Sequence, residues 1–471
     1  MLSKPAIQTE TPLKTTTKNP KLFYFVAWRW HFYAGLFVVP FLIMLSLTGL
    51  VMLYDDAIEQ AEYSQIINIE PETTPLAPSV QLAAVTAQYP NAAVKQYLTP
   101  PTADKASRFA ISNQSDAALF ITVNPYTAEV LGEINRDESW YSLANDIHGT
   151  LLIGDTGDRL IEIAASLSIV LLITGLYLWW PRDKASKAGF LKIRFNSGKR
   201  LLWRDLHANI GVITGLFLLL FLVSGLSWAG IWGGRFVQPW NSFPAEKWDN
   251  VPLSEVDHSS MNHSQSKEVA WNLEQTPMPN SKAQLNTLHA ANSLNIDQVV
   301  NFALANGFSR FRVNFPSSET GVFTVSANTM SGDISDATQD RTTHIDQYSG
   351  EVLAEAAWPD YSLMAKFMAA GIALHQGDMG LANVIANTLL CVAFIFIAVS
   401  GVVMWWLRRP KGALNLAAPP LPQNLPLWKS ASLVMIAVSL MFPLAGISLL
   451  SVLLLDFILL SRVPVLKRLT D

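Results

Sequence analysis

Long apolar runs alternate along the chain with polar, mixed stretches. A helix needs about 20 mostly apolar residues to cross the hydrocarbon core of a bilayer. Four runs reach this length, at 31–54, 160–180, 207–232 and 381–407. A fifth run at 428–461 is long for one span and short for two, and Pro443 within it fits a kink or the turn of a helical hairpin. We therefore predict a polytopic α-helical membrane protein with five or six spans.

Lysine and arginine gather in the short segments beside these runs, which the positive-inside rule assigns to the cytoplasm. These segments are 1–30, 181–206 and 408–427, and a tail follows at 462–471. The N-terminus is then cytoplasmic, and the long stretches 55–159 and 233–380 lie outside. Tryptophan pairs at 179–180 and 405–406 fit an aromatic belt at the inner interface.

Both outer stretches contain a strand–turn–strand pattern. Residues 121–131 and 345–353 alternate apolar and polar positions around Tyr-[Thr/Ser]-[Ala/Gly]-Glu-Val-Leu, which predicts a β-hairpin in each. Segments 310–315 and 321–325 predict further strands. We expect one outer α+β domain in each stretch.

The two halves of the chain repeat one another. The runs at 31–54 and 207–232 both begin with His-x3-Gly and carry [Thr/Ser]-Gly-Leu further on, with the second glycine eighteen residues after the histidine. The runs at 160–180 and 381–407 both contain [Thr/Ser]-Gly followed by Trp-Trp-x-Arg, and a histidine with Gly-Asp-x-Gly precedes each. The pattern predicts an internal duplication of span, outer domain and span, with the repeat axis along the membrane normal.

Composition narrows the function. The chain of 471 residues is 50% hydrophobic and 15% charged, against about 25% charged in typical soluble domains. A net charge of −4 argues against a nucleic-acid partner. The single cysteine, Cys391, excludes a disulfide framework and a multi-cysteine metal site. Motifs for ATP binding, dinucleotide binding, zincin proteolysis and serine hydrolysis do not occur in the sequence, so any electrons must come from a separate donor.

Four of the eight histidines occupy equivalent places in the two halves. His31 and His207 begin outward spans at the inner side, and His148 and His375 precede inward spans at the outer side. A two-fold-like repeat brings equivalent residues to one depth, so each pair can face across a shared axis. Two facing imidazoles suit the axial positions of a b-type haem, and two such haems would form an electron path across the membrane.

Further residues fit this hypothesis, and each has a structural alternative. Arg29 and Arg204 are candidates for haem propionate partners, and Gly35 and Gly211 could let a macrocycle approach the helix. The glycines equally suit close helix packing, and the four histidines could be structural residues kept by duplicated ancestry. Met379 is an alternative axial ligand, and two aspartates, Asp155 and Asp378, are weaker candidates to hydrogen-bond the outer histidines. No catalytic residue is assigned beyond the haem ligands.

The other four histidines have no counterpart in the other half. We take His258, His263, His289 and His344 as solvated surface residues of the second outer stretch, with a weak metal contact as an alternative for His258 and His263. Asp456 in the last apolar run has no assigned partner.

These motifs together resemble a known family. The segment Trp28-Arg29-Trp30-His31-x3-Gly35, the two hairpin signatures and the Trp-Trp-x-Arg ends are similar to the PepSY-associated transmembrane family, over residues 20–462. Its members are iron-regulated bacterial inner-membrane proteins, some of them haem-containing ferric-siderophore reductases. The resemblance implies periplasmic PepSY domains, two b-type haems held by the four repeated histidines, and release of siderophore iron by reduction. Some members carry a fused flavoprotein reductase, which this sequence lacks.

We therefore expect an inner-membrane di-haem oxidoreductase. Electrons from an unidentified cytoplasmic donor would enter at the His31/His207 haem, pass to the His148/His375 haem and reduce a ferric siderophore in the periplasm, releasing Fe(II). Two other classes remain open. One is a haem-free PepSY protein that binds a peptide or regulates a protease, and the other is a permease for a siderophore or metal.

Overall fold

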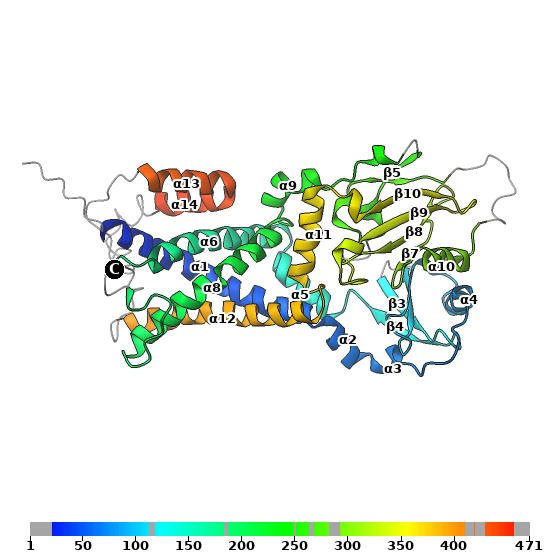
Figure 1. Cartoon of the computed structure of the whole chain (residues 1–471), viewed down its shortest axis with the longest axis horizontal. Coiled ribbons are helices and arrows are strands. Elements are labelled where there is room, and N and C mark those ends of the chain that lie inside the picture. The colour runs from blue at the N-terminus through cyan, green and yellow to red at the C-terminus, as the bar shows by residue number, and fades with distance from the viewer. Residues whose placement is uncertain are drawn as a thin grey trace, which may run out of the picture.

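Four long helices form one bundle in the computed structural model, which describes residues 21–112, 118–182, 187–248, 251–262, 268–281, 293–409, 419 and 429–455. They are α1 (Lys21–Leu53), α6 (Asp155–Trp179), α8 (Lys199–Leu226) and α12 (Leu381–Arg408), and they run side by side (Figure 1). Each is long and apolar enough to cross a membrane. Large apolar side chains such as Leu216 and Leu389, 64% and 65% exposed, point away from the bundle, as expected of helices surrounded by lipid. The chain is a multi-pass membrane protein.

The fifth apolar run folds, as far as it is described, into two short helices. These are α13 (Lys429–Met441) and α14 (Pro443–Leu455), and they pack against each other. Pro443 lies in the first turn of α14, where a backbone N–H would have no partner within the helix, so its absence costs no hydrogen bond. The described part of each helix corresponds to about 20 Å of α-helix. Phe442 and Ala445 bury themselves against the bundle. Asp456 and the tail 462–471 lie outside the described residues.

The two outer stretches share a single sheet. The first contributes β1 (Ala93–Leu98), β2 (Ser107–Ser112), β3 (Ala118–Val123) and β4 (Val130–Asn135). The second contributes β7 (Arg312–Asn314), β8 (Val322–Ala327), β9 (Arg341–Asp346) and β10 (Val352–Ala357). The order is β10-β9-β8-β7-β1-β2-β3-β4, and β1 pairs antiparallel with β7, with Gln96 opposite Asn314 (Figure 1). The predicted hairpins are confirmed as β3–β4 and β9–β10.

One face of this sheet carries the apolar core. Helices α4 (Pro78–Gln88) and α10 (Ile296–Ala305) pack on this face. Each helix precedes, in the sequence, the four strands of its own half. The buried side chains include Val85, Phe109, Ile121, Val299 and Phe323. Both halves therefore contribute the same order of elements, a helix followed by four antiparallel strands.

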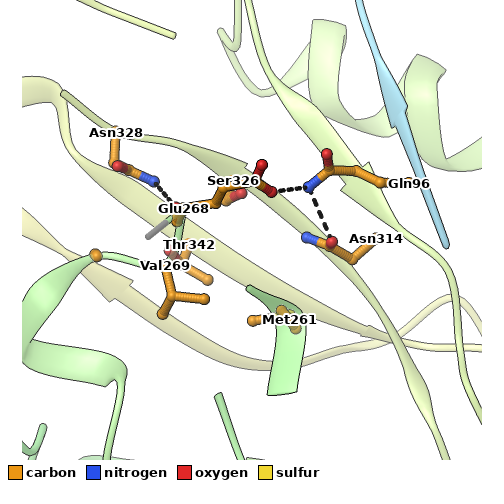
Figure 2. A pocket seen from close by; sticks show the side chains of 9 residues that line it. Gln96, Met261, Glu268, Val269, Asn314, Ser326, Asn328 and Thr342 are labelled. Carbon is orange, nitrogen blue, oxygen red and sulfur yellow. Dashed lines mark hydrogen bonds between the residues drawn. The ribbon is translucent and has the colours of Figure 1, made fainter. Parts of the chain in front are cut away.

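The opposite face has two parts. Across β2, β3 and β4 it carries Ala110, Phe120 and Ile134, which pack against Ile67 of α3 (Ser64–Ile67). The rest carries polar side chains such as Gln96, Asn314 and Thr342 and is covered by the excursion 232–281 of the second outer stretch. Its elements are α9 (Trp232–Phe236), η1 (Gln238–Trp240), η2 (Ala245–Lys247), β5 (Leu253–Asp257), η3 (His258–Met261), η4 (Trp271–Leu273) and β6 (Pro277–Pro279). Between the excursion and the sheet lies a cavity of about 10 Å³, the room for a single water (Figure 2). Gln96 donates from Nε2 to Glu268 Oε2 and Asn314 Oδ1 there, at 3.2 and 3.1 Å. This cavity is far too small for a ferric chelate.

Short helices join the bundle to the sheet. The outgoing connection of the first half uses α2 (Asp55–Glu62) and α3 (Ser64–Ile67). The returning connections use α5 (Trp140–Thr150) in the first half and α11 (Leu363–Gln376) in the second, which follows η6 (Ala337–Gln339) and η7 (Trp358–Asp360). Both α5 and α11 lie between the bundle and the sheet (Figure 1), and they carry the two outer histidines.

Candidate functional site

The four repeat-related histidines form two facing pairs. The ring centres of His31 on α1 and His207 on α8 are 6.3 Å apart, and their planes are perpendicular at 89°. Those of His148 on α5 and His375 on α11 are 6.5 Å apart, with planes at 81°. The structure thus brings together the two pairs of histidines that the sequence repeat predicts to lie at the same depth in the membrane.

A hydroxyl oxygen lies beside the Nδ1 atom of every one of these imidazoles. His31 contacts Thr174 Oγ1 at 3.0 Å and His148 contacts Thr48 Oγ1 at 2.9 Å. In the second half, the hydroxyl partners are Ser400 for His207, at 2.8 Å, and Ser224 for His375, at 2.7 Å. All four contacts join residues of the same half of the chain.

These hydroxyls determine the tautomer of the histidines. Each hydroxyl donates its one hydrogen to a carbonyl of its own helix, three or four residues earlier, as Thr48 does to Met44 O at 2.9 Å. Its oxygen must then accept from the imidazole, so the histidine carries its proton on Nδ1. His207 supports this assignment, because its Nδ1 also faces the carbonyl oxygen of Ile397 at 3.2 Å, which can only accept. The Nε2 lone pair of each ring is left for a ligand.

A glycine follows each hydroxyl residue and makes room for the ring. A Cβ atom placed on Gly175 would lie 3.1 Å from His31 Cε1, which is tighter than ordinary contact. The corresponding distances at Gly401, Gly49 and Gly225 are 3.6, 3.9 and 3.9 Å to their own histidines. Each long helix therefore carries one [Ser/Thr]-Gly pair beside one imidazole. The hydroxyl accepts a hydrogen bond from the ring, and the glycine, which has no side chain, leaves space for it.

This role of the hydroxyls was not predicted from the sequence. The pattern [Thr/Ser]-Gly recurs in all four runs, but the glycines given a role beside the macrocycle were Gly35 and Gly211, and the partners predicted for the outer histidines were Asp155 and Asp378. In the structure, Thr48 and Ser224 occupy that position. The signal was available, because a hydroxyl residue preceding the equivalent glycine in all four helices requires more than close packing.

The pair geometry fits two axial ligands of one metal ion. Two imidazoles that bind a metal from opposite sides, each through a nitrogen about 2.0–2.1 Å from the metal and about 1.1 Å from the ring centre, place their centres about 6.3 Å apart. The observed separations are 6.3 and 6.5 Å. Within the described part of the chain, none of the four Nε2 atoms has a hydrogen-bond partner. The residues present therefore fit a bis-histidine haem at each level.

The two arginines assigned to propionates have other partners in the structure. Arg29 is buried, donates from its guanidinium to Pro419 O at 2.7 Å and lies 5.1 Å from the ring centre of Tyr33. Arg204 is half exposed and pairs with Asp205 at 3.2 Å. Their propionate role stays a prediction. Met379, the alternative axial ligand, lies in the turn after α11 with 38% of its surface exposed.

Two further histidines form a buried pair, so their assignment to the surface was wrong. His258 and His344 are both 0% exposed, with their Nε2 atoms 3.0 Å apart. His258 Nδ1 donates to the carbonyl oxygen of Thr276 at 2.5 Å, so its Nε2 accepts from His344 Nε2. The Thr324 hydroxyl completes the chain by donating to His344 Nδ1 at 2.9 Å. This histidine clasp joins the excursion to strand β9; His263 and His289 lie outside the described residues.

Burial keeps the histidine clasp uncharged. It lowers the pKa of His258 to about 4, and burial together with the neighbouring His258 lowers the pKa of His344 well below its usual value. Trp248 packs beside both rings, with centre separations of 6.0 and 5.9 Å. The two Nε2 atoms share one hydrogen bond, and both Nδ1 atoms have partners. The clasp is therefore a complete neutral hydrogen-bond chain, in which no imidazole nitrogen keeps a lone pair for a metal.

A larger cavity lies beside the edge strand β10. Its volume is about 370 Å³, within the range of small-molecule sites, and Phe243, Lys247 and Trp248 form the wall opposite the strand. It is the larger of the two cavities described here, and it lies in the outer region.

Comparison with known proteins agrees with the architecture. A search of curated proteins found no match. A family model described as the PepSY-associated TM region matches residues 28–408, which is most of the chain. The protein therefore belongs to the PepSY-associated TM region family.

Proposed function

We propose that this protein is a di-haem electron-transfer protein of the bacterial inner membrane that reduces ferric siderophores on the periplasmic side. The observation that carries the proposal is the pair of facing imidazole sets, each with its tautomer fixed and its ring separation matched to bis-histidine ligation. When bound, two b-type haems supply one-electron transfer at two depths of the membrane.

The chain's own helices set the distance between the two levels. His31 belongs to the inner pair, and Thr48 on the same helix supports the outer pair. Seventeen residues separate them, which corresponds to about 26 Å of α-helix. His207 and Ser224 repeat this spacing on α8. The two levels therefore lie near opposite sides of a hydrocarbon core about 30 Å thick.

The proposed orientation follows from charge. Arg182, Lys187 and Lys192 lie between α6 and α8, and Lys199 and Arg200 begin α8, all at the end that carries the inner pair. The positive-inside rule assigns this end to the cytoplasm, where an electron donor would dock. The sheet then lies in the periplasm. One electron delivered there converts chelated Fe(III) to Fe(II), which binds the hard oxygen ligands of a siderophore less well.

The first test is the visible spectrum of the detergent-purified protein with a pyridine haemochrome assay. We expect two haems per chain, and one in either His207→Ala or His375→Ala. Gln376→Ala, on the exposed neighbour of His375, is the matched control and should keep both. Ser224→Ala should weaken haem binding at the outer pair by about 10–100-fold, because it removes the hydroxyl that orients His375. A featureless spectrum after expression with haem precursor would overturn the proposal in favour of a haem-free binding protein.

The second test addresses the substrate. Dithionite-reduced protein, freed of excess reductant, is mixed anaerobically with a ferric hydroxamate or catecholate siderophore and a ferrous-specific dye. Reoxidation of the protein with one Fe(II) trapped per electron supports siderophore reduction. If the protein has its full haem content but no ferric chelate reoxidises it, siderophore reduction is refuted, and the protein is an electron carrier with a different acceptor.

A further inference from the structure

The short helix α11 carries an apolar stripe that no described part of the chain covers. Leu363, Phe367 and Leu374 are 86, 58 and 49% exposed, and their spacing places them on one helix face. The opposite face buries Ala365, Met368 and Ile372 against the protein. At 14 residues the helix is too short to be a span, yet both of its faces are apolar.

The first half repeats this feature on α5. Trp140 precedes His148 by eight residues, as Phe367 precedes His375, and the two aromatic side chains are 57 and 58% exposed. Leu143 extends the α5 stripe and is 43% exposed. Both halves therefore expose an aromatic side chain at the same place ahead of the histidine.

The turn between α5 and α6 adds a second observation. Leu151 and Leu152 adopt φ values of +53° and +61°, a left-handed conformation that large side chains rarely accept. The turn projects Leu152 and Ile153 outward, 58 and 55% exposed. In water this turn would carry two unfavourable free-energy terms, the backbone strain and the exposure of two large apolar side chains. In lipid the exposure is no longer unfavourable.

The stripe of α11 continues into a surface that faces lipid. Only residues 377–380 separate α11 from α12, whose first outward positions Leu381, Ile385 and Leu389 are 75, 52 and 65% exposed. Trp240 on η1 is 65% exposed, the same fraction as Trp406 at the inner interface. Exposed tryptophans mark the headgroup level at both ends of a membrane protein.

We infer that α5, α11 and the α5–α6 turn are immersed in the outer leaflet, with acyl chains covering their exposed stripes. These helices then lie at the boundary of headgroups and acyl chains, as amphipathic interfacial helices do. The bilayer surface runs between them and the sheet, so the His148–His375 pair lies below it. An acceptor in water reaches this pair only from the side of the sheet.

Site-directed spin labelling tests the inference in nanodiscs of a phosphatidylethanolamine and phosphatidylglycerol mixture. Cys391 is buried, and Cys391→Ser provides the background. Phe367→Cys and Trp140→Cys place nitroxides on the two stripes. Leu389→Cys is the reference for lipid, and Leu304→Cys on α10, 55% exposed in the outer region, is the matched reference for water.

We expect the labels at 367 and 140 to collide with oxygen as the label at 389 does, and to lose collisions with a water-soluble nickel chelate. Collision rates like those at 304 would overturn the inference, because the stripes would then face water. Low collision with both reagents would overturn it as well and would indicate a protein partner or a second copy on the stripe. Unlabelled Trp140→Phe and Trp240→Phe chains in bromolipid nanodiscs give an independent readout, since each should lower lipid quenching of tryptophan fluorescence.

Discussion

Acid should loosen the attachment of the excursion 232–281 to the sheet. The native histidine clasp of His258 and His344 holds no ionic charge, whereas both imidazoles take up protons in the unfolded chain below about pH 6.5. Because the folded pKa of His258 is lowered to about 4, the stabilisation is complete above pH 6.5 and is lost as the pH falls towards 4. A difference of about 2.5 pKa units corresponds to about 3 kcal/mol from His258 alone. His344 changes in the same direction.

Hydrogen exchange followed by mass spectrometry measures this loss locally. Protection of β9 and of the segment around His258 is compared between pH 7 and pH 4.5, after correction for the intrinsic exchange rate. The control is the double variant His258→Gln/His344→Gln, which keeps donors and acceptors in the clasp but cannot titrate. We expect protection to fall in the wild type and to stay nearly constant in the variant. Equal pH dependence in the two proteins would refute the buried neutral clasp.

Two further predictions concern glycine positions. Gly175→Ala should reduce haem content, because its Cβ would lie 3.1 Å from His31 Cε1. Gly225→Ala should not, because its Cβ would lie 3.9 Å from His375 Cε1. Equal haem per chain in both variants would contradict the idea that Gly175 makes room for the imidazole. In the β3–β4 turn, Ala128 has φ +60°, as Gly350 has φ +76° in the β9–β10 turn. Ala128→Gly should raise the free energy of unfolding by about 0.5–1 kcal/mol, since the relieved left-handed strain exceeds the added chain entropy. Gly350→Ala should lower the free energy of unfolding. A decrease for Ala128→Gly, or an increase for Gly350→Ala, in denaturant titrations would contradict this interpretation of the turns.

The sequence predicts the features that depend on composition and on local pattern. The spans follow from apolar runs of sufficient length, and the pairs His31–His207 and His148–His375 follow from the repeat. The pairing of β1 with β7 could not be predicted, because more than two hundred residues separate Gln96 from Asn314 and neither strand specifies its neighbour. The strands merge because each half alone has an exposed edge, which the other half covers.

The histidine clasp could not be predicted from the sequence for a different reason. His258 lies among serines and asparagines, which usually indicate a solvated loop. Its burial depends on His344, Thr276 and Trp248, which meet it only in the folded chain. By contrast, the hydroxyl partners of the four repeated histidines could have been predicted from the sequence, since Thr48 and its three counterparts each precede an equivalent glycine.

The shared sheet also limits how the two halves can move. A carrier with repeated halves transports its substrate by rocking one half against the other around a central site. Here Gln96, Tyr97 and Leu98 lie opposite Asn314, Val313 and Arg312 in the antiparallel pair β1–β7, so the outer ends of the halves are joined across one continuous ladder. Opening the outer side would have to break that ladder. The architecture is that of a fixed frame, suited to holding groups at constant separation while electrons move, and poorly suited to a permease.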